Sequence, residues 1–373
     1  MIRNRYTEMK KMIYYLTAFL LLAPFCNLLA QRLPPSCGTP SSTHNFLKDI
    51  APENFRVLAG TRIIKMFVVV YADDDGSNVA IDEETLKNEL AFSNSIYNMG
   101  DICFSIVGIE IRNNTTLNNP GSSSVNYSTH RVTDAFTVFI VRSIGGASGN
   151  TGTFGWAPGI PASYMITRTG GFGVRRTFIH EMGHAFGLEH TFKGTGDDDD
   201  NPGCHELVNG SNGAICGDFV VDTPADPYER CGTTISGCTF PYTGTGCRDA
   251  NNSAYSPQMN NFMSYWANYN CNRTVFTNGQ YTRMQSTIDN NITLSSFLAT
   301  DNLVVTNATI SSGFVKKASK NLISVGNINS AGNYTVNGSV QAVFSSFQVE
   351  VKPGFTATPN STGVVRILAS NCQ

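Results

Sequence analysis

Apolar residues follow two different patterns of spacing along the chain, and each pattern predicts a different kind of secondary-structure element. Residues 62–71 form a nearly continuous apolar run rich in β-branched side chains, which predicts a central strand. Residues 82–98 begin with acidic side chains and carry Leu86, Leu90 and Tyr97 at helical spacing, so they predict a helix.

Two further apolar stretches, residues 103–111 and 135–141, predict strands, and residues 172–188 predict a second helix. A strand, a helix and then two strands favour a mixed sheet covered by a helix. We therefore expect an α/β (α+β) domain with a mixed twisted sheet, a backing helix and a second helix that carries the motif described below.

The pattern changes after about residue 293, where the helical spacing ends. The remaining residues are rich in Val, Ile, Ser, Thr, Asn and Gly, and short strand candidates alternate with turns at residues 304–310, 322–325, 334–336, 347–351 and 364–368. We expect a small all-β domain over residues 294–373, which serves either as a cap or as a contact for a surface or glycan. No block repeat is visible in it.

Composition narrows the class of protein. The 373 residues carry a formal net charge of −2, so we expect no broad basic surface and no nucleic-acid partner. Charged residues make up only 14% of the chain, and 34 glycines accompany many Asn, Ser and Thr residues. This composition suits an extracellular, loop-rich and partly β protein.

The N-terminus has the order of features found in an export signal. Residues 1–11 carry several basic side chains, residues 12–30 are largely apolar, and Ala30 offers a small residue at the cleavage point. We expect residues 1–30 to be a signal peptide and the mature protein to be secreted, without stable membrane insertion. A retained signal anchor is the alternative, because the apolar run is near spanning length.

Ten cysteines are present, and most of them should be paired in an exported protein. Six lie in one stretch, which we expect to be a disulfide-held loop: Cys204, Cys216, Cys231, Cys238, Cys247 and Cys271. A second zinc site is the competing interpretation, but no C-x₂-C pair supports it.

Three histidines lie in a pattern that suits zinc. Residues 180–190 read HEMGHAFGLEH, or H-E-x-x-H-x-x-G-x-x-H. On a helix His180 and His184 project from one face, and Gly187 permits a sharp left-handed exit that returns His190 as a third ligand. Three protein ligands leave one zinc position open, which is typical of catalytic sites. The alternative is a helix with unrelated histidines.

Glu181 gives this motif its chemistry. A zinc ion would acidify a bound water and polarise a substrate carbonyl, while Glu181 takes the water's proton and later delivers it to the leaving amine. An extracellular binding or adhesion module with a vestigial metal site is an alternative, but a dead site has no need to retain Glu181. A zinc hydrolase acting on non-peptide amides is a third interpretation.

The longer pattern is characteristic of metzincin peptidases, which add a downstream methionine turn. Residues 260–265, NNFMSY, are the candidate turn. The residues around both motifs resemble the pappalysin family: Arg176-Thr177-Phe178, His190-Thr191-Phe192, Cys271, Phe276-Thr277, Gln280 and Arg283-Met284. This resemblance covers roughly residues 60–290 and implies a zinc metalloendopeptidase domain over residues 56–293 that cleaves proteins or peptides.

The resemblance also implies roles for single residues of the site. Met263 would form an apolar floor beneath the zinc rather than a ligand. Tyr265 resembles the tyrosine that helps to hold the oxyanion in some metzincins, with simple packing as its alternative. Residues 153–158 would form the upper edge of the cleft, where substrate pairs as an extra strand, or else a structural loop closed by Pro158 and Pro161.

Cys37 is a candidate cysteine switch. Relatives in the pappalysin family carry a similar Cys-Gly in a short prosegment, where the thiolate caps the zinc, and here residues 31–55 would be that segment. The alternative is an ordinary disulfide from Cys37 to Cys103 or Cys372.

The resemblance also implies two disulfides within the loop of six cysteines. One of them would tie Cys271 back to the loop, with Cys231 as the expected partner.

Calcium is a second candidate ion. The resemblance places calcium near Asp222 and Thr223, in an oxygen-rich stretch that suits this ion. For the nearby acidic run at residues 197–200, a solvated loop is the favoured interpretation. Residues 264–273 contain no carboxylate, so we expect no strict preference for basic substrate residues from this wall.

Overall fold

The computed structural model describes residues 37–39, 60–121, 125–146, 152–172, 176–195, 204–228, 238–240, 247–266, 271–328, 330–369 and 372. All of these residues belong to one unit, Leu33–Gln373. The predicted signal peptide and most of the predicted prosegment lie outside the described residues. No helix in the described ranges is long and apolar enough to cross a membrane.

A five-stranded sheet, in the order β2-β1-β3-β5-β4, forms the framework of the first part of the fold. Four strands run parallel and β4 runs antiparallel to β5, so the predicted mixed sheet is confirmed. All but one of the β1 residues are buried, as the continuous apolar run predicts for an interior strand. The strands are β1 Arg62–Ala72, β2 Ile102–Asn113, β3 Phe136–Val141, β4 Gly155–Trp156 and β5 Tyr164–Arg168.

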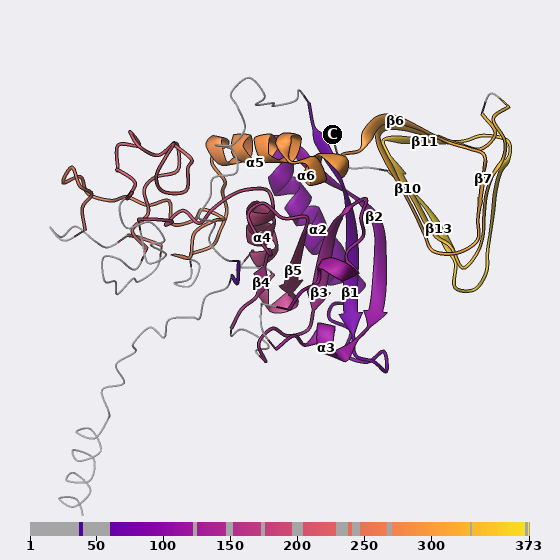
Figure 1. Ribbon diagram of the computed structural model, residues 1–373, viewed down its shortest axis with the longest axis horizontal. Coiled ribbons are helices and arrows are strands. Elements are labelled where there is room, and N and C mark those ends of the chain that lie inside the picture. Colours follow the sequence, from indigo (N-terminus) through magenta and orange to yellow (C-terminus); the bar gives the residue numbers. More distant parts are fainter. Residues whose placement is uncertain are drawn as a thin grey trace, which may run out of the picture. The chain divides into compact units, whose positions relative to one another are not determined.

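Helices cover one face of this sheet. Asp82 caps the first long helix by accepting hydrogen bonds from Thr85 N and Thr85 Oγ1, which explains the acidic start seen in the sequence. Figure 1 shows α2 and α4 in front of the strands, with α5 and α6 above them. The described helices are α2 Glu83–Tyr97, α3 Thr115–Asn118, α4 Thr177–Ala185, α5 Asn278–Asn290 and α6 Ile292–Ser296.

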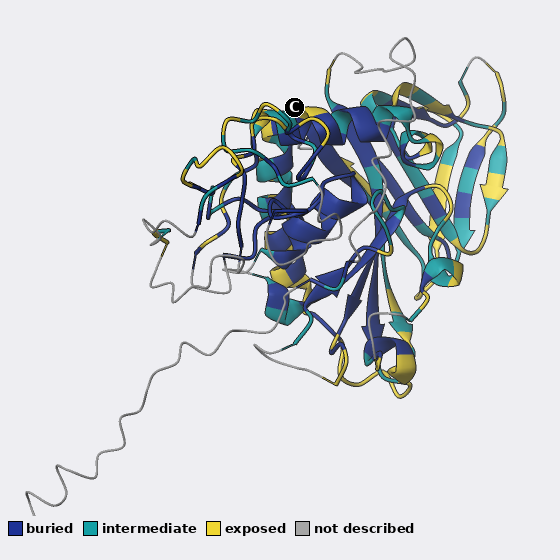
Figure 2. Cartoon of the chain, turned by 60° about the vertical axis from the view of Figure 1, so that its left-hand side comes forward, coloured by how far each residue is buried: buried dark blue, intermediate teal, exposed yellow. Residues whose placement is uncertain are grey.

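The alternation of side chains along β1 divides the interior into two cores. Even-numbered residues such as Met66 and Val68 pack in one core with α2, α4 and α5. Odd-numbered residues such as Phe67 and Val69 pack in a second core on the other face. Figure 2 shows that the central strands are almost wholly buried, whereas exposed residues gather on loops and outer strands. Helix α4 is buried throughout, and α2 buries only the side that faces the sheet.

The C-terminal strands form a three-sided parallel β-solenoid. Every strand pair in this region is parallel, and inward positions stack from coil to coil, as Ala308, Tyr334 and Phe355 do. The triangular outline of the three faces is visible end-on in Figure 1. The strands are β6 Thr300–Val305, β7 Ala308–Ile310, β8 Phe314–Val325, β9 Tyr334–Gly338, β10 Gln341–Ser346, β11 Gln348–Val351, β12 Phe355–Pro359 and β13 Val364–Ala369.

The solenoid covers the second face of the sheet. Ala318 and Cys372 belong to the second core, Phe314 packs edge-on against Phe67 at 5.0 Å, and Ser105 Oγ donates a hydrogen bond of 2.8 Å to Ser345. A disulfide also joins Cys103 at the start of β2 to Cys372. The all-β character was predicted, but the repeat of the coils was not. The predicted boundary after residue 293 falls inside α6, and residues up to Phe297 pack in the first core.

Candidate metal centre

Helix α4 carries the first two histidines. It covers Thr177–Ala185 and is shorter at both ends than the helix predicted over residues 172–188, because Arg176 has a left-handed backbone at φ 52° and the chain leaves the helix before Gly187. His180 and His184 are one turn apart and fully buried. Gly187 follows the helix with φ +97°, a conformation that favours glycine, and a Cβ there would lie 2.4 Å from Thr287 Oγ1. The turn therefore needs glycine for its backbone and for its packing, and it brings His190 back beside the helix.

The three imidazoles converge on one point. His184 Nε2 lies 3.1 Å from His180 Nε2 and 3.1 Å from His190 Nε2. His180 Nδ1 and His184 Nδ1 each lie 2.7 Å from a backbone carbonyl, of Phe262 and Leu188 respectively, so each Nδ1 donates its proton there. The facing Nε2 atoms of this pair must then carry lone pairs and cannot bond to one another.

Such a set of lone pairs fits a cation. Burial, and next the charge of Arg273, hold the pKa of His180 well below its usual value, so the ring is neutral and able to coordinate. One ligand atom from each of Cys37, His180, His184 and His190 lies within 4.8 Å of the others. Nitrogen and sulfur donors in this number suit zinc.

Cys37 lies at this centre as a free, buried thiol. Because Cys103 and Cys372 are bonded to each other, the alternative of a disulfide from Cys37 to either is wrong. Cys37 pairs in parallel with Gly155 of β4, and Gly38 N donates a hydrogen bond of 2.7 Å to Gly155 O. Burial, and next the Glu181 charge, raise the pKa of the Cys37 thiol well above its usual value.

Glu181 faces the same segment. Its Oε2 accepts a hydrogen bond of 2.7 Å from Thr39 Oγ1 and lies 3.4 Å from Cys37 Sγ. Thr39 Oγ1 in turn accepts a hydrogen bond of 2.7 Å from Ala157 N. Burial is the main cause that raises the pKa of Glu181 to about 7. Thr39 was not identified from the sequence, and its place two residues after Cys37 is the only signal that could have indicated it.

Strand β4 forms the edge of the sheet beside the metal centre, where residues 153–158 were predicted to form an upper rim. Gly155 leaves room for the Glu181 side chain, because a Cβ at this position would lie 2.8 Å from Glu181 Cγ and 2.9 Å from Ile166 O. The absence of a side chain at residue 155 thus allows the carboxylate to approach the rim.

Met263 lies directly against α4. It is fully buried, and a Cβ added at Gly183 would lie 2.5 Å from Met263 Sδ. Asn261 Oδ1 accepts hydrogen bonds from Met263 N and from Gln280 Nε2, so the start of α5 holds the segment around Met263, which is the candidate methionine turn. Gln280 also completes a capping box with Thr277.

Tyr265 borders the cluster. Its ring lies 4.6 Å from the His190 ring and 6.0 Å from the His180 ring, and its hydroxyl is 3.5 Å from Cys37 O. The side chain is buried, and its contacts are compatible with both of its predicted roles.

Asp226, which the sequence did not reveal, lies behind these residues. Its buried carboxylate accepts hydrogen bonds from Thr191 Oγ1 at 2.6 Å, from Trp266 Nε1 at 3.0 and 3.1 Å, and from Tyr228 N at 3.1 Å. Burial is the main cause that raises the pKa of Asp226 to about 7. No local pattern around residue 226 indicates these contacts, because its partners are distant in sequence.

The residues predicted to lie near calcium make contacts within the protein instead. Asp222 accepts hydrogen bonds from Thr277 Oγ1 at 2.7 Å and Gly279 N at 2.8 Å, so both its oxygens cap α5. Thr223, the next residue in the sequence, is buried. Within the described ranges, the buried acidic oxygens without a hydrogen-bond partner include both of Glu206 and Oδ2 of Asp218. The acidic run at residues 197–200 lies outside those ranges.

The disulfide loop is partly as predicted. Cys204 is bonded to Cys216, and Cys271 is tied back to the loop through Cys238. The prediction that Cys231 is the partner of Cys271 is therefore wrong. Cys247 is also disulfide-bonded. Residues 267–270, which belong to the stretch without carboxylates at residues 264–273, lie outside the described ranges.

Comparison with known proteins finds relatives that are extracellular metalloproteases. No family model matches the chain. An extracellular metalloprotease of Colletotrichum graminicola is 31% identical over 234 residues, which are 59% of this chain and 73% of that protein. A second from this fungus is 28% identical over 308 residues (71% and 93%), and one from Neurospora crassa is 26% identical over 281 residues (68% and 87%).

A solved structure of mirolysin in complex with compound 9 matches 64% of this chain and 96% of that chain, with 16% identity and a TM-score of 0.42. At that TM-score the likeness adds nothing to the assignment, which rests on the sequence relatives. Because the first relative exceeds 30% identity over most of its own length, the chain belongs to the extracellular metalloprotease family.

Proposed function

We propose that this chain is a secreted zinc-dependent endopeptidase made in a latent form. One observation carries the proposal: the Nε2 atoms of His180 and His190 each lie 3.1 Å from His184 Nε2, and Glu181 follows the first histidine directly. Membership of an extracellular metalloprotease family supports protein or peptide substrates and export. The sequence of residues 1–30 supports export by a signal peptide.

His180, His184 and His190 would hold the zinc, and Cys37 would fill its fourth position in the latent state. When bound, zinc supplies an acidified water and an electrophile for the scissile carbonyl. Glu181 accepts the proton of the attacking water and passes it to the amine that leaves. Burial favours this task, because it brings the carboxylate pKa to about 7, close to neutral pH.

Met263 and Tyr265 complete the site in this proposal. Met263 packs against Gly183 and supplies the apolar floor under the histidines. Tyr265 has its hydroxyl beside the carbonyl of Cys37, and in the active enzyme this hydroxyl would donate a hydrogen bond to the oxyanion of the substrate.

The contacts of residues 37–39 support a cysteine-switch zymogen. Cys37 Sγ is one of the four clustered ligand atoms, and a thiolate is a strong zinc ligand. Thr39 adds a second block, because its hydroxyl bonds to Oε2 of Glu181, the carboxylate that would otherwise accept a proton from water. Removal of the segment before about residue 55 would free the metal, the base and the rim at Gly155 together.

We further propose that a calcium ion neutralises Glu206 and Asp218 rather than binding through Asp222. Burial first, and Asp218 next, raise the pKa of Glu206 to about 9, and burial raises that of Asp218 well above its usual value. A hard cation with oxygen ligands would relieve both carboxylates. Both oxygens of Asp222 already accept hydrogen bonds from the start of α5.

For the β-solenoid we propose a covering role. Strand β8 supplies Phe314 and Ala318, which close the second core and cover Phe67. Strand β10 contacts the sheet through the hydrogen bond between Ser345 and Ser105. A contact of the solenoid with a surface or glycan stays a prediction.

Digestion of casein, with and without a metal chelator, tests the proposed function. We expect the chain freed of its prosegment to digest casein, a chelator to stop digestion, and added zinc to restore it. Digestion that a chelator leaves unchanged would exclude the metal from the reaction. A chain that binds zinc without digesting any protein or peptide would favour the alternative of a binding module.

A further inference from the structure

Three loops meet at the carboxylate of Asp226. One follows the third histidine at Thr191, one contains Asp226 and Tyr228, and one follows the methionine turn at Trp266. Asp226 Oδ2 accepts the Thr191 hydroxyl at 2.6 Å, and both oxygens lie 3.0–3.1 Å from Trp266 Nε1. The carboxylate is fully buried, so these contacts are not exchanged with solvent.

The partners of Asp226 are direct neighbours of two residues of the site. Thr191 follows His190, and Trp266 follows Tyr265. Neither pair lies in a helix of more than one turn or in a strand, so no hydrogen-bond ladder fixes these backbones. One backbone hydrogen bond, from Thr191 N to Met263 O at 3.2 Å, joins the same two loops.

Aromatic side chains also connect the loops that contain Thr191 and Trp266. The Tyr228 ring lies 4.9 Å from Phe192, 5.7 Å from Tyr265 and 5.0 Å from Trp266. Because Asp226 also accepts the Tyr228 backbone N–H, the carboxylate fixes the residue that fills the space between the two loops.

We infer that Asp226 is a positioning residue, which sets His190 and Tyr265 relative to the other two histidines through Thr191 and Trp266. This inference rests on the proposed zinc site. Asparagine should replace it well, because its oxygen can accept from Trp266 and Tyr228 while its amide donates to the Thr191 hydroxyl. Alanine removes all of these contacts and leaves their donors buried without an acceptor.

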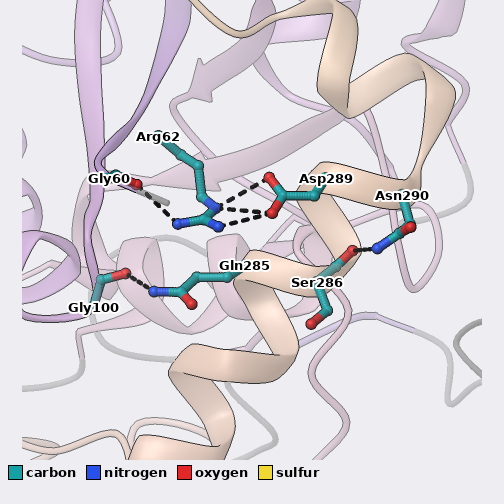
Figure 3. Close-up of polar contacts among 7 residues, drawn as sticks. All are labelled: Gly60, Arg62, Gly100, Gln285, Ser286, Asp289 and Asn290. Carbon is teal, nitrogen blue, oxygen red and sulfur yellow. Dashed lines mark hydrogen bonds and ion pairs between the residues drawn. The ribbon is translucent and has the colours of Figure 1, made fainter. Parts of the chain in front are cut away.

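Cobalt binding to the full chain tests the inference, because the visible spectrum of cobalt reports ligand geometry independently of activity. Asp226→Ala and Asp226→Asn are compared with wild type and with Asp289→Ala. Asp289 is a matched control: it is a fully buried carboxylate bonded to Arg62 at 2.8 Å, and it joins α5 to β1 (Figure 3). Its loss should lower the unfolding temperature without reaching the histidines.

We expect Asp226→Ala to weaken cobalt affinity by about 10- to 100-fold and to change the spectrum, as loss of a residue that orients a metal ligand does. Asp226→Asn and Asp289→Ala should keep wild-type affinity and spectrum. The inference fails if Asp226→Ala binds cobalt like wild type, or if Asp289→Ala changes affinity and spectrum as much. Absence of cobalt binding in wild type would instead refute the proposed zinc site.

Thr191→Val and Trp266→Phe carry the test if Asp226→Ala does not fold, because each removes a single donor. Each should weaken cobalt affinity and shift the spectrum in the same direction. Wild-type affinity in both of these variants would overturn the inference.

Discussion

Gly187 allows a quantitative test of how the chain brings His190 to the other histidines. Its φ of +97° strains any residue with a side chain, at a cost of about 1–3 kcal/mol. A Cβ would also lie 2.4 Å from Thr287 Oγ1 and 2.9 Å from Thr287 Cγ2, and such overpacking costs about 1–3 kcal/mol. We expect Gly187→Ala to lower the free energy of unfolding by roughly 2–6 kcal/mol and to weaken zinc binding.

The two costs can be separated, because only the packing cost depends on Thr287. In a double-mutant cycle with Thr287→Ala, the stability lost to overpacking should return while the backbone strain persists. Denaturant unfolding measures the free energies, and competition with a chromophoric chelator measures zinc affinity. If Gly187→Ala keeps both wild-type stability and wild-type zinc affinity, the turn does not place His190 in the way described.

In the chain that retains its prosegment, Cys37→Ala should raise casein digestion. Adding Thr39→Val should raise digestion further, because Glu181 then also loses its hydrogen bond to the prosegment. Unaltered latency in both variants would refute the switch. In cation-free buffer the unfolding temperature should fall as the pH rises toward about 9, because Glu206 and Asp218 have raised folded-state pKa values and stabilise the fold only while protonated. Calcium should oppose that fall, and a thermal scan that shows neither effect would refute the proposed ion. Deleting residues 300–373 should abolish soluble, zinc-binding protein, since the second core loses its cover; an active truncated chain would contradict this role of the solenoid.

Local patterns predicted those features whose cause is local. The spacing of His180 and His184 follows from the helix period, and the end of α4 follows from Gly187. The acidic residue before α2 is its cap, and the apolar run of β1 is an interior strand. In each case the residues that determine the element are neighbours in the sequence.

Features that depend on distant residues were missed. Thr39 reaches Glu181 across 142 positions, and the acceptor of the Trp266 indole, Asp226, lies 40 positions away. Cys238 became the partner of Cys271 because of how the loop folds back, which cysteine spacing does not determine. Such contacts leave no periodic signal in a single sequence.

The β-solenoid was missed for a related reason. Its coils share only the placement of inward apolar side chains, and the lengths of the segments between strands differ from coil to coil. The alternating pattern therefore predicts strands, but not their parallel stacking.

Zinc content and peptide hydrolysis, measured together in Glu181→Gln after removal of the prosegment, test whether Glu181 is the general base of a zinc peptidase. Glutamine keeps the shape of the side chain but cannot accept and return a proton. We expect the variant to retain stoichiometric zinc while its kcat/KM falls by about 100- to 10,000-fold relative to wild type. Near-normal hydrolysis by the zinc-loaded variant would contradict this role of Glu181.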